Sequence, residues 1–88
     1  MTERKVLFVD DEKQILDLLE KAFTKKGYAV RRAANADDAK KILEAEKINV
    51  VFLDLNMPGT NGVELCRWIK AENPVAIPHA VTGYGRLF

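Results

Sequence analysis

Four short segments of the chain carry the apolar pattern of β-strands. Residues 5–9 (KVLFV) and 49–53 (NVVFL) hold continuous apolar runs, which are typical of strands covered on both faces. Residues 28–33 (YAVRRA) alternate, which predicts a strand with one less buried face near a sheet edge. Residues 76–82 (AIPHAVT) predict a fourth strand. Pro78 is tolerated there only near the start or on an exposed edge, because proline lacks a backbone N–H.

Between these strands, apolar residues recur at helical spacing in three segments. They are Ile15, Leu18, Leu19, Ala22 and Phe23 in the first segment, Ala39, Ile42 and Leu43 in the second, and Val63, Cys66 and Ile69 in the third. Gly27 is placed to stop the first helix, and Asn35 is placed to cap the second. The third helix follows a loop at 54–61 and ends near Asn73, because Pro74 cannot continue it.

Strands therefore alternate with helices in the order β-α-β-α-β-α-β. Units of this kind form parallel sheets with right-handed crossovers, so the predicted fold class is α/β with a doubly wound parallel sheet. Ligands of such sheets bind beyond the carboxyl ends of the strands, near the point where the strand order reverses. The residues that directly follow the strands are thus the first candidates for chemistry.

Composition narrows the class of protein. The 88 residues predict one small domain over residues 1–88, and an apolar content of 48% suffices for a core. A net charge of +1 gives no overall field for nucleic acid or an anionic membrane. The single cysteine, Cys66, excludes an internal disulfide and a Cys-cluster metal site, and we expect it to be a small core residue. The apolar run at 6–9 is too short for a signal peptide or membrane span, so we expect a soluble cytoplasmic protein.

Three carboxylates follow two of the predicted strands. Asp10 and Asp11 come after the first strand, and Asp54 comes after the third. If these strands are neighbours, the carboxylates converge, repel one another and raise their own pKa values unless a cation neutralises them. Oxygen ligands without His or Cys select a hard ion, so we expect Mg²⁺ or Mn²⁺.

Each of these residues also has a structural interpretation. Asp10 or Asp11 is a good cap for the helix that begins near Lys13, and Asp54 is a good turn residue ahead of Pro58. Taken singly, capping and turn roles are the more common ones. The joint occurrence of acidic residues at two strand ends favours the metal site.

The fourth predicted strand adds a hydroxyl group, that of Thr82, at the same edge. Gly83 follows it and leaves its backbone N–H accessible. A hydroxyl and an amide beside a metal-bound carboxylate suit a phosphoryl group, and a carboxylate can itself become an aspartyl phosphate. Asp54 lies between apolar strand residues and a loop, so it is the candidate nucleophile. Thr82 alone would be read as an ordinary β-branched strand residue.

With these motifs the chain resembles the receiver domain of bacterial two-component response regulators. The matching stretches are VLFVDDE (6–12), VVFLDLNMPGTNGVEL (50–65) and AVTG (80–83). The resemblance implies a phosphoacceptor in phosphorelay signal transduction, which receives its phosphoryl group from a histidine kinase or a phosphotransfer protein. It further implies slow autophosphatase activity and no other enzyme activity.

The resemblance also implies a role for each candidate residue. Asp54 would be the phosphoacceptor. Asp11 would be the direct Mg²⁺ ligand, Asp10 a ligand mainly through water, and the backbone carbonyl of Asn56 a further ligand. Thr82 would be the switch hydroxyl that turns toward the phosphoryl group.

The family fold is flavodoxin-like, with strand order 2-1-3-4-5 and helices on both faces. Four strands and three helices are predicted here, so we expect an incomplete sheet of order 2-1-3-4 and a C-terminally truncated domain. The family's lysine after the fifth strand has no counterpart, because no lysine follows Lys70. An open edge on the fourth strand would favour self-association.

Three other functions compete with the phosphoacceptor. One is a phosphorylation-incompetent module that works by interaction or dimerisation. A haloacid-dehalogenase-type phosphatase would need Asp-x-Asp after the first strand, where this chain has DDEKQ. A flavodoxin-type FMN carrier would need a Ser/Thr/Gly-rich loop there, and the acidic residues would repel its phosphate.

Overall fold

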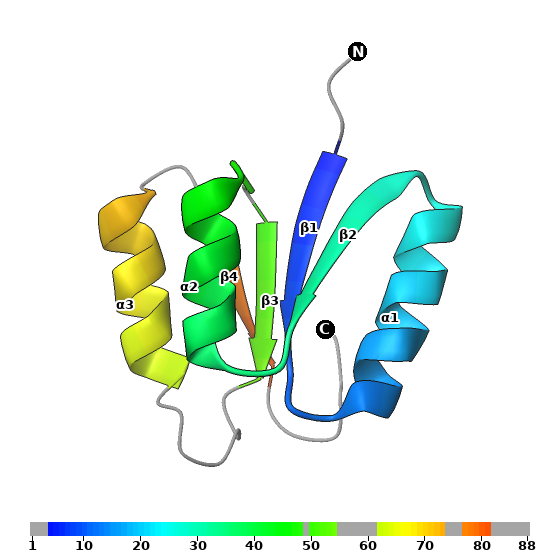
Figure 1. Ribbon diagram of the computed structural model, residues 1–88, viewed down its shortest axis with the longest axis horizontal. Coiled ribbons are helices and arrows are strands. Elements are labelled where there is room, and N and C mark those ends of the chain that lie inside the picture. The colour runs from blue at the N-terminus through cyan, green and yellow to red at the C-terminus, as the bar shows by residue number, and fades with distance from the viewer. Residues whose placement is uncertain (1–3, 49, 55–61, 74–76, 82–88) are drawn as a thin grey trace.

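The computed structural model describes residues 4–48, 50–54 and 62–73 and the course of the backbone at 77–81. Strands and helices alternate through this part of the chain (Figure 1). The elements are β1 (Arg4–Val9), α1 (Lys13–Lys25), β2 (Tyr28–Ala33), α2 (Ala36–Ala45), β3 (Val50–Asp54), α3 (Gly62–Glu72) and β4 (Ile77–Val81). All the predicted elements are present, with ends within one or two residues of the predicted bounds.

The four strands form one parallel sheet in the order β2-β1-β3-β4. β1 lies between β2 and β3, and its last residue, Val9, pairs with Ala33 and with Leu53. One residue further along, Asp54 pairs with Val81 of β4. The predicted fold class and strand order are therefore confirmed. The carboxyl ends of β1, β3 and β4 meet at one edge, as parallel pairing requires.

The helices cover the sheet unequally. α1 lies on one face, and α2 and α3 lie on the other (Figure 1). Side chains of β1 alternate between the faces, as the two-residue period of a strand dictates. The larger core, on the α2–α3 face, consists of Leu7, Val9, Ala33, Ala39, Ile48, Val51, Leu53, Leu65 and Ile69. The buried residues on the α1 face are Val6, Phe8 and Leu16.

Aromatic side chains surround the smaller core. Phe8 stacks on Phe52 with ring centroids 5.3 Å apart, and its edge contact with Phe23 of α1 spans 5.0 Å. Phe23 in turn makes an edge contact with Tyr28 at 5.3 Å. Offset and edge-to-face aromatic pairs contribute stability beyond their buried area. Four elements, β1, β2, β3 and α1, are thereby joined on this face.

Three residues assigned to the apolar stripes, Leu18, Ala22 and Val63, are exposed and do not face the core. Leu18 is 66% exposed and Val63 is 53% exposed. In α1 the buried residue is Leu16, and in α3 Leu65 is buried four positions before Ile69. The sheet meets only one side of each helix, so residues on the flank of a wide stripe stay in solvent. Cys66, predicted to be a small core residue, is partly buried and packs against the larger core, and this burial raises the pKa of its thiol.

The predicted helix signals act as expected. Gly27 follows α1 with a φ of +92°, a conformation that favours glycine. The side chain of Asn35 accepts a hydrogen bond from the backbone N–H of Asp38 at 2.8 Å and so caps α2. Pro78 is the second residue of β4, the outer strand of the described sheet. Among the described residues, no helix has the length and apolar character needed to cross a membrane.

α1 is attached to the rest of the fold by few buried groups. Leu16 is its one buried residue, with Leu19 and Phe23 partly buried against the same core. Polar contacts add to this attachment from β2. A single guanidinium nitrogen of Arg32 contacts Asp17 at 2.7 Å and Glu20 at 2.8 Å. These are partly exposed ion pairs, which contribute little each.

Candidate metal centre

Two neighbouring strands bring acidic side chains to the same edge of the sheet. Asp10 directly follows β1, and Asp54 is the last residue of β3. One carboxylate oxygen from each of Asp10, Asp11 and Asp54 lies within 4.8 Å of the other two. The grouping expected from neighbouring strand ends is therefore present. Its use as a metal site stays a prediction.

Backbone contacts fix the position of Asp10 from two sides. Its N–H donates to the carbonyl of Ala33 at 3.0 Å, which extends the pairing of β1 with β2 by one residue. Its carboxylate Oδ1 accepts the N–H of Glu12 at 2.9 Å. The side chain is only 6% exposed, so it has little freedom to turn away from the other two carboxylates.

The electrostatic environment of Asp10 opposes its ionisation. Burial is the main cause that raises the pKa of this carboxyl, and the neighbouring charges of Asp54, Asp11 and Glu12 raise it further. The hydrogen bond from the Glu12 N–H acts in the opposite direction but does not reverse the shift. A cation at this position would offset both the burial and the repulsion.

The cluster has a buried side and an open side. Asp10 and Asp54 are 6% and 7% exposed, whereas Asp11 is exposed. Around Mg²⁺, with bonds of about 2.1 Å, neighbouring ligand oxygens lie roughly 3 Å apart and opposite ones roughly 4.2 Å apart. A spacing of up to 4.8 Å is slightly wider than this, and a water between one carboxylate and the ion would accommodate the difference. The donor set thus suits a hard divalent ion approached through Asp11.

The capping role considered for Asp10 or Asp11 and the turn role considered for Asp54 are not what the structure shows. The residue at the N-cap of α1 is Glu12, whose side chain makes no capping hydrogen bond, so neither Asp10 nor Asp11 occupies the cap. Asp10 instead holds the backbone just before the helix through its bond to the Glu12 N–H. Asp54 is a buried residue within β3 and not a turn residue, because it continues the pairing with β4.

Two candidate residues, Asn56 and Thr82, lie outside the described residues, and their roles stay predictions. Val81, the residue before Thr82, pairs with Asp54. The contribution of the Ala33 carbonyl and the Glu12 N–H escaped prediction from the sequence. Both act through backbone atoms, which every residue type carries, so no side-chain pattern could have indicated them.

Comparison with known families identifies the chain. A sequence model described as the response regulator receiver domain matches residues 6–87. The chain belongs to this family. The receiver domain's flavodoxin-like fold agrees with the sheet order described above.

Solved receiver structures resemble the chain closely. A CheY-like receiver domain protein from Methanospirillum hungatei is 31% identical, covers 98% of this chain and 69% of its own, and superposes with a TM-score of 0.89. The regulator TrrA of Thermotoga maritima, solved with Mg²⁺ and BeF, is 32% identical, with 92% and 70% covered and a TM-score of 0.84. TrrA has also been solved in complex with the histidine kinase ThkA, at 31% identity, with 94% and 72% covered and a TM-score of 0.84.

A third relative carries the modification itself. A response regulator protein from Burkholderia pseudomallei, solved with a phosphorylated aspartic acid, a calcium ion and citrate, is 32% identical. It covers 93% of this chain and 48% of its own, with a TM-score of 0.87. This receiver domain therefore spans about 70% of the first two chains and about half of the third.

Proposed function

We propose that this receiver domain accepts a phosphoryl group on Asp54 from a histidine kinase in a Mg²⁺-dependent step of two-component signalling. The observation that carries the proposal is the cluster of Asp10, Asp11 and Asp54, whose carboxylate oxygens lie within 4.8 Å of one another. Such a group of acidic oxygens is costly without a cation and suits a hard one. The Mg²⁺–BeF complex of TrrA and the phosphorylated aspartic acid of the Burkholderia protein support the same chemistry.

Asp54 is the nucleophile of the proposed step. One of its carboxylate oxygens forms a bond to phosphorus while the N–P bond of the donor phosphohistidine breaks. The electron pair of that bond returns to the imidazole, which then takes up a proton. Asp54 suits this role because β3 holds it at the strand end, 7% exposed, beside the other two carboxylates. A bound Mg²⁺ would neutralise charge on the phosphoryl oxygens.

The other residues would hold the ion and the product. We assign Asp11 as the direct ligand because it is the exposed member of the cluster, and Asp10 as a ligand through water because its Oδ1 is already engaged by the Glu12 N–H. By family resemblance, the backbone carbonyl of Asn56 would be a further ligand of the ion, and the hydroxyl of Thr82 would turn toward the phosphoryl group. Later attack of water on the aspartyl phosphate would return Asp54 to its resting state, which makes the domain a slow autophosphatase.

The proposed partner is a histidine kinase or a phosphotransfer protein in the cytoplasm. TrrA is a relative that has been solved bound to such a kinase. The domain's net charge of +1 gives no reason to add nucleic acid as a direct partner.

A second candidate function is an interaction module that dimerises without phosphorylation. It is favoured by the position of β4 as the outer strand of the sheet that the described residues form, because an edge strand can pair with a strand of another chain. We propose that a second copy covers this edge. The molecular mass in solution tests it, and a monomer at high protein concentration would contradict it.

Phosphorylation separates the two functions directly. The full chain is incubated with acetyl phosphate and Mg²⁺, and its intact mass is measured. We expect one added phosphoryl group that maps to Asp54, is absent in Asp54→Asn and is lost when Mg²⁺ is chelated. Asp37→Asn, which changes an exposed aspartate of α2, should behave as the unmodified protein.

Circular dichroism of Asp54→Asn shows that the loss does not come from unfolding. An adduct that persists in this variant would contradict the role of Asp54. An unphosphorylated protein that still dimerises would favour the interaction module.

A further inference from the structure

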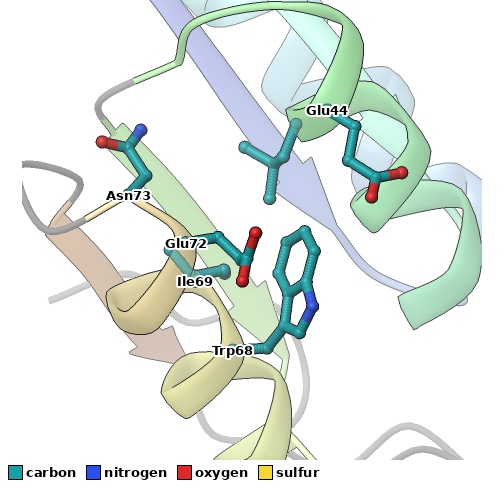
Figure 2. Close-up of a pocket in the computed structure, with 6 residues that line it drawn as sticks. Glu44, Trp68, Ile69, Glu72 and Asn73 are labelled. Carbon is teal, nitrogen blue, oxygen red and sulfur yellow. The ribbon is translucent and has the colours of Figure 1, made fainter.

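A groove lies between α2 and α3, at the end of the sheet opposite the carboxylate cluster. Its cavity of about 270 Å³ is lined by Leu43, Glu44, Trp68, Ile69, Glu72 and Asn73 (Figure 2). Asn73 holds this end of α3 to the chain before β3, since its side-chain amide donates to the carbonyl of Ile48 at 3.3 Å. Small-molecule pockets usually begin near 300 Å³, so the groove is of a size for one large side chain.

The lining of the groove is apolar below and acidic at the rim. Ile69 is buried at its base, and Trp68 is partly buried beside it. Glu72 lies on the α3 side with its carboxylate near the indole of Trp68, and Glu44 lies on the α2 side of the groove (Figure 2). Both glutamates are exposed, and within the described part of the chain neither forms an ion pair. The groove therefore presents two uncompensated carboxylates around an aromatic ring.

The indole already attracts a cation of the protein itself. The Lys40 ammonium, one helical turn before Glu44, lies 5.5 Å from the centre of the Trp68 ring. This distance is within the range of a cation–π contact, which is worth about 0.5–1 kcal/mol at an exposed site. Lys40 is thus a weakly bound cation of the same chain, which a cation with more contacts can replace at the Trp68 ring.

We propose that this groove is a docking site for an arginine side chain of a partner protein. A guanidinium matches the indole and the two carboxylates. Its plane stacks on an indole, while its fork of N–H donors reaches both carboxylates. A lysine ammonium is a point charge and gains less from a planar ring. Arginine and tryptophan are also the residue types that most often dominate binding at protein interfaces. The site is separate from the proposed phosphoacceptor and does not depend on it.

NMR of the full chain tests the site with a short peptide, acetyl-Gly-Arg-Gly-amide. The chain has a single tryptophan, so one indole N–H signal reports on Trp68. We expect saturable shifts of this signal and of the backbone signals of the lining residues. The same peptide with citrulline in place of arginine should give none, because citrulline keeps the shape and lacks the charge.

Variants of the rim give the matched controls. Glu44→Gln and Glu72→Gln should each weaken arginine binding about two- to five-fold, the range of an exposed ion pair. Glu64→Gln, on the same helix but outside the groove, should leave binding unchanged, and Lys40→Gln should strengthen it. The backbone spectrum of each variant shows whether it is folded.

Any of three results would overturn the proposal. Equal shifts with arginine and citrulline, or unchanged arginine binding in the Glu44→Gln, Glu72→Gln double variant, would exclude recognition of the charge. Tighter binding of spermidine with the same map of shifts would mark the groove as a site for free polyamines and not for a partner's arginine.

Discussion

Asp10 is fixed by two backbone hydrogen bonds and yet destabilises the metal-free domain. Its backbone N–H completes the pairing with Ala33, and its Oδ1 accepts the N–H of Glu12. At the same time burial and the charges of Asp54 and Asp11 raise the pKa of its carboxyl. When it is ionised at neutral pH, Asp10 therefore lowers the stability of the metal-free domain. Functional residues are where such local conflicts are expected.

Replacing Asp10 by asparagine should stabilise the metal-free protein. The Asn side chain keeps the acceptor for the Glu12 N–H and removes one charge from the cluster. Two unit charges about 5 Å apart repel by roughly 1 kcal/mol in bulk water and by more where burial excludes water, so we expect a gain in the free energy of unfolding of at least about 1 kcal/mol. Urea denaturation in a chelator measures it, with the exposed Asp11→Asn as a variant that should gain less.

Addition of Mg²⁺ should reverse this order. The unmodified protein gains stability from an ion that binds only the folded state, whereas Asp10→Asn gains less because one ligand has lost its charge. A lower stability of Asp10→Asn in chelator would show that the repulsion does not govern this residue. Equal stabilisation of both proteins by Mg²⁺ would remove Asp10 from the ion's ligands.

The residue scale also marks the limit of prediction from the sequence. Asp10 and Asp54 could be expected to meet only once β1 and β3 were taken as neighbours, and that order came from family resemblance. The groove between α2 and α3 was not predicted at all. Glu44 and Trp68 are 24 positions apart by number, and only the packing of the two helices brings them together.

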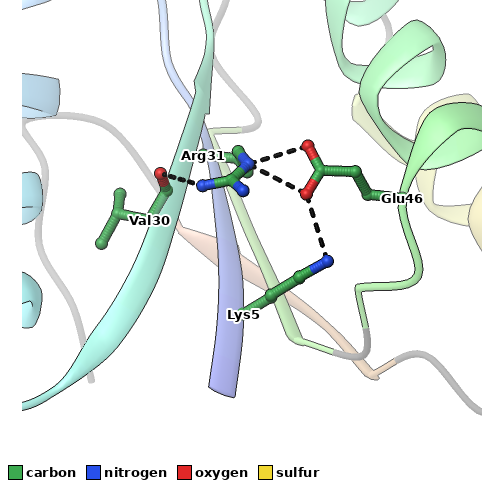
Figure 3. A network of polar contacts seen from close by, with 4 residues as sticks. All are labelled: Lys5, Val30, Arg31 and Glu46. Atoms are coloured by element: carbon green, nitrogen blue, oxygen red, sulfur yellow. Dashed lines mark hydrogen bonds and ion pairs between the residues drawn. The ribbon is translucent and has the colours of Figure 1, made fainter. Parts of the chain in front are cut away.

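At the scale of elements, an ion-pair network joins three parts of the chain. Glu46, directly after α2, contacts Arg31 of β2 at 2.8 Å and Lys5 of β1 at 3.3 Å (Figure 3). The Arg31 Nε–H is shared between both carboxylate oxygens, and another nitrogen of its guanidinium donates to the Val30 carbonyl at 3.2 Å. The network lies at the amino end of the strands, away from the acidic cluster.

Glu46 should make stability depend on pH. The hydrogen bond from Arg31, and then the one from Lys5, lower the pKa of this carboxyl below the ordinary glutamate value of 4.5. Its contribution is therefore complete at pH values above 4.5 and is lost as the pH falls below that value through the lowered pKa. Urea denaturation of Glu46→Gln should show a deficit at neutral pH that shrinks toward low pH.

Glu44→Gln is the control for this measurement, since Glu44 is exposed and makes no ion pair among the described residues. As a substitution of an exposed residue, it should change the free energy of unfolding by less than about 0.5 kcal/mol. A deficit of Glu46→Gln that stays constant down to low pH would mean that the contacts of Glu46 act through packing and not through its charge.

Elements were the most predictable level of this protein. Continuous apolar runs located β1 and β3, and turn and cap residues such as Gly27 and Asn35 placed the helix ends. The faces of the helices were less predictable. Leu18 and Val63 lie at helical spacing with core residues, yet they are exposed because a stripe drawn from sequence is wider than the surface that the sheet covers.

At the scale of the whole molecule, stability rests mainly on the α2–α3 side. A chain of 88 residues has a total stability of roughly 4–13 kcal/mol, at the usual 0.05–0.15 kcal/mol per residue. Among the residues whose burial the structure describes, the larger core holds nine, whereas the α1 face holds three. A single cavity in the larger core is thus a large fraction of the total.

Leu7→Ala should therefore unfold a substantial part of the population. Leu7 is fully buried in β1, and truncation of a buried leucine costs about 2–5 kcal/mol. Leu18→Ala, at a site 66% exposed, should change the free energy of unfolding by less than about 0.5 kcal/mol. Urea denaturation followed by circular dichroism compares the two, and similar losses would contradict this division between core and surface.

The slight attachment of α1 has a kinetic consequence. With Leu16 as its one buried residue, this helix should detach before the sheet and the opposite helices open, so its amide protons should exchange with deuterium earliest. Its amino end is also tethered to the loop that carries Asp10 and Asp11. An ion bound by that loop would restrain the helix. The amide exchange rate along α1 would then report, at a distance, whether the carboxylates at the strand ends hold an ion.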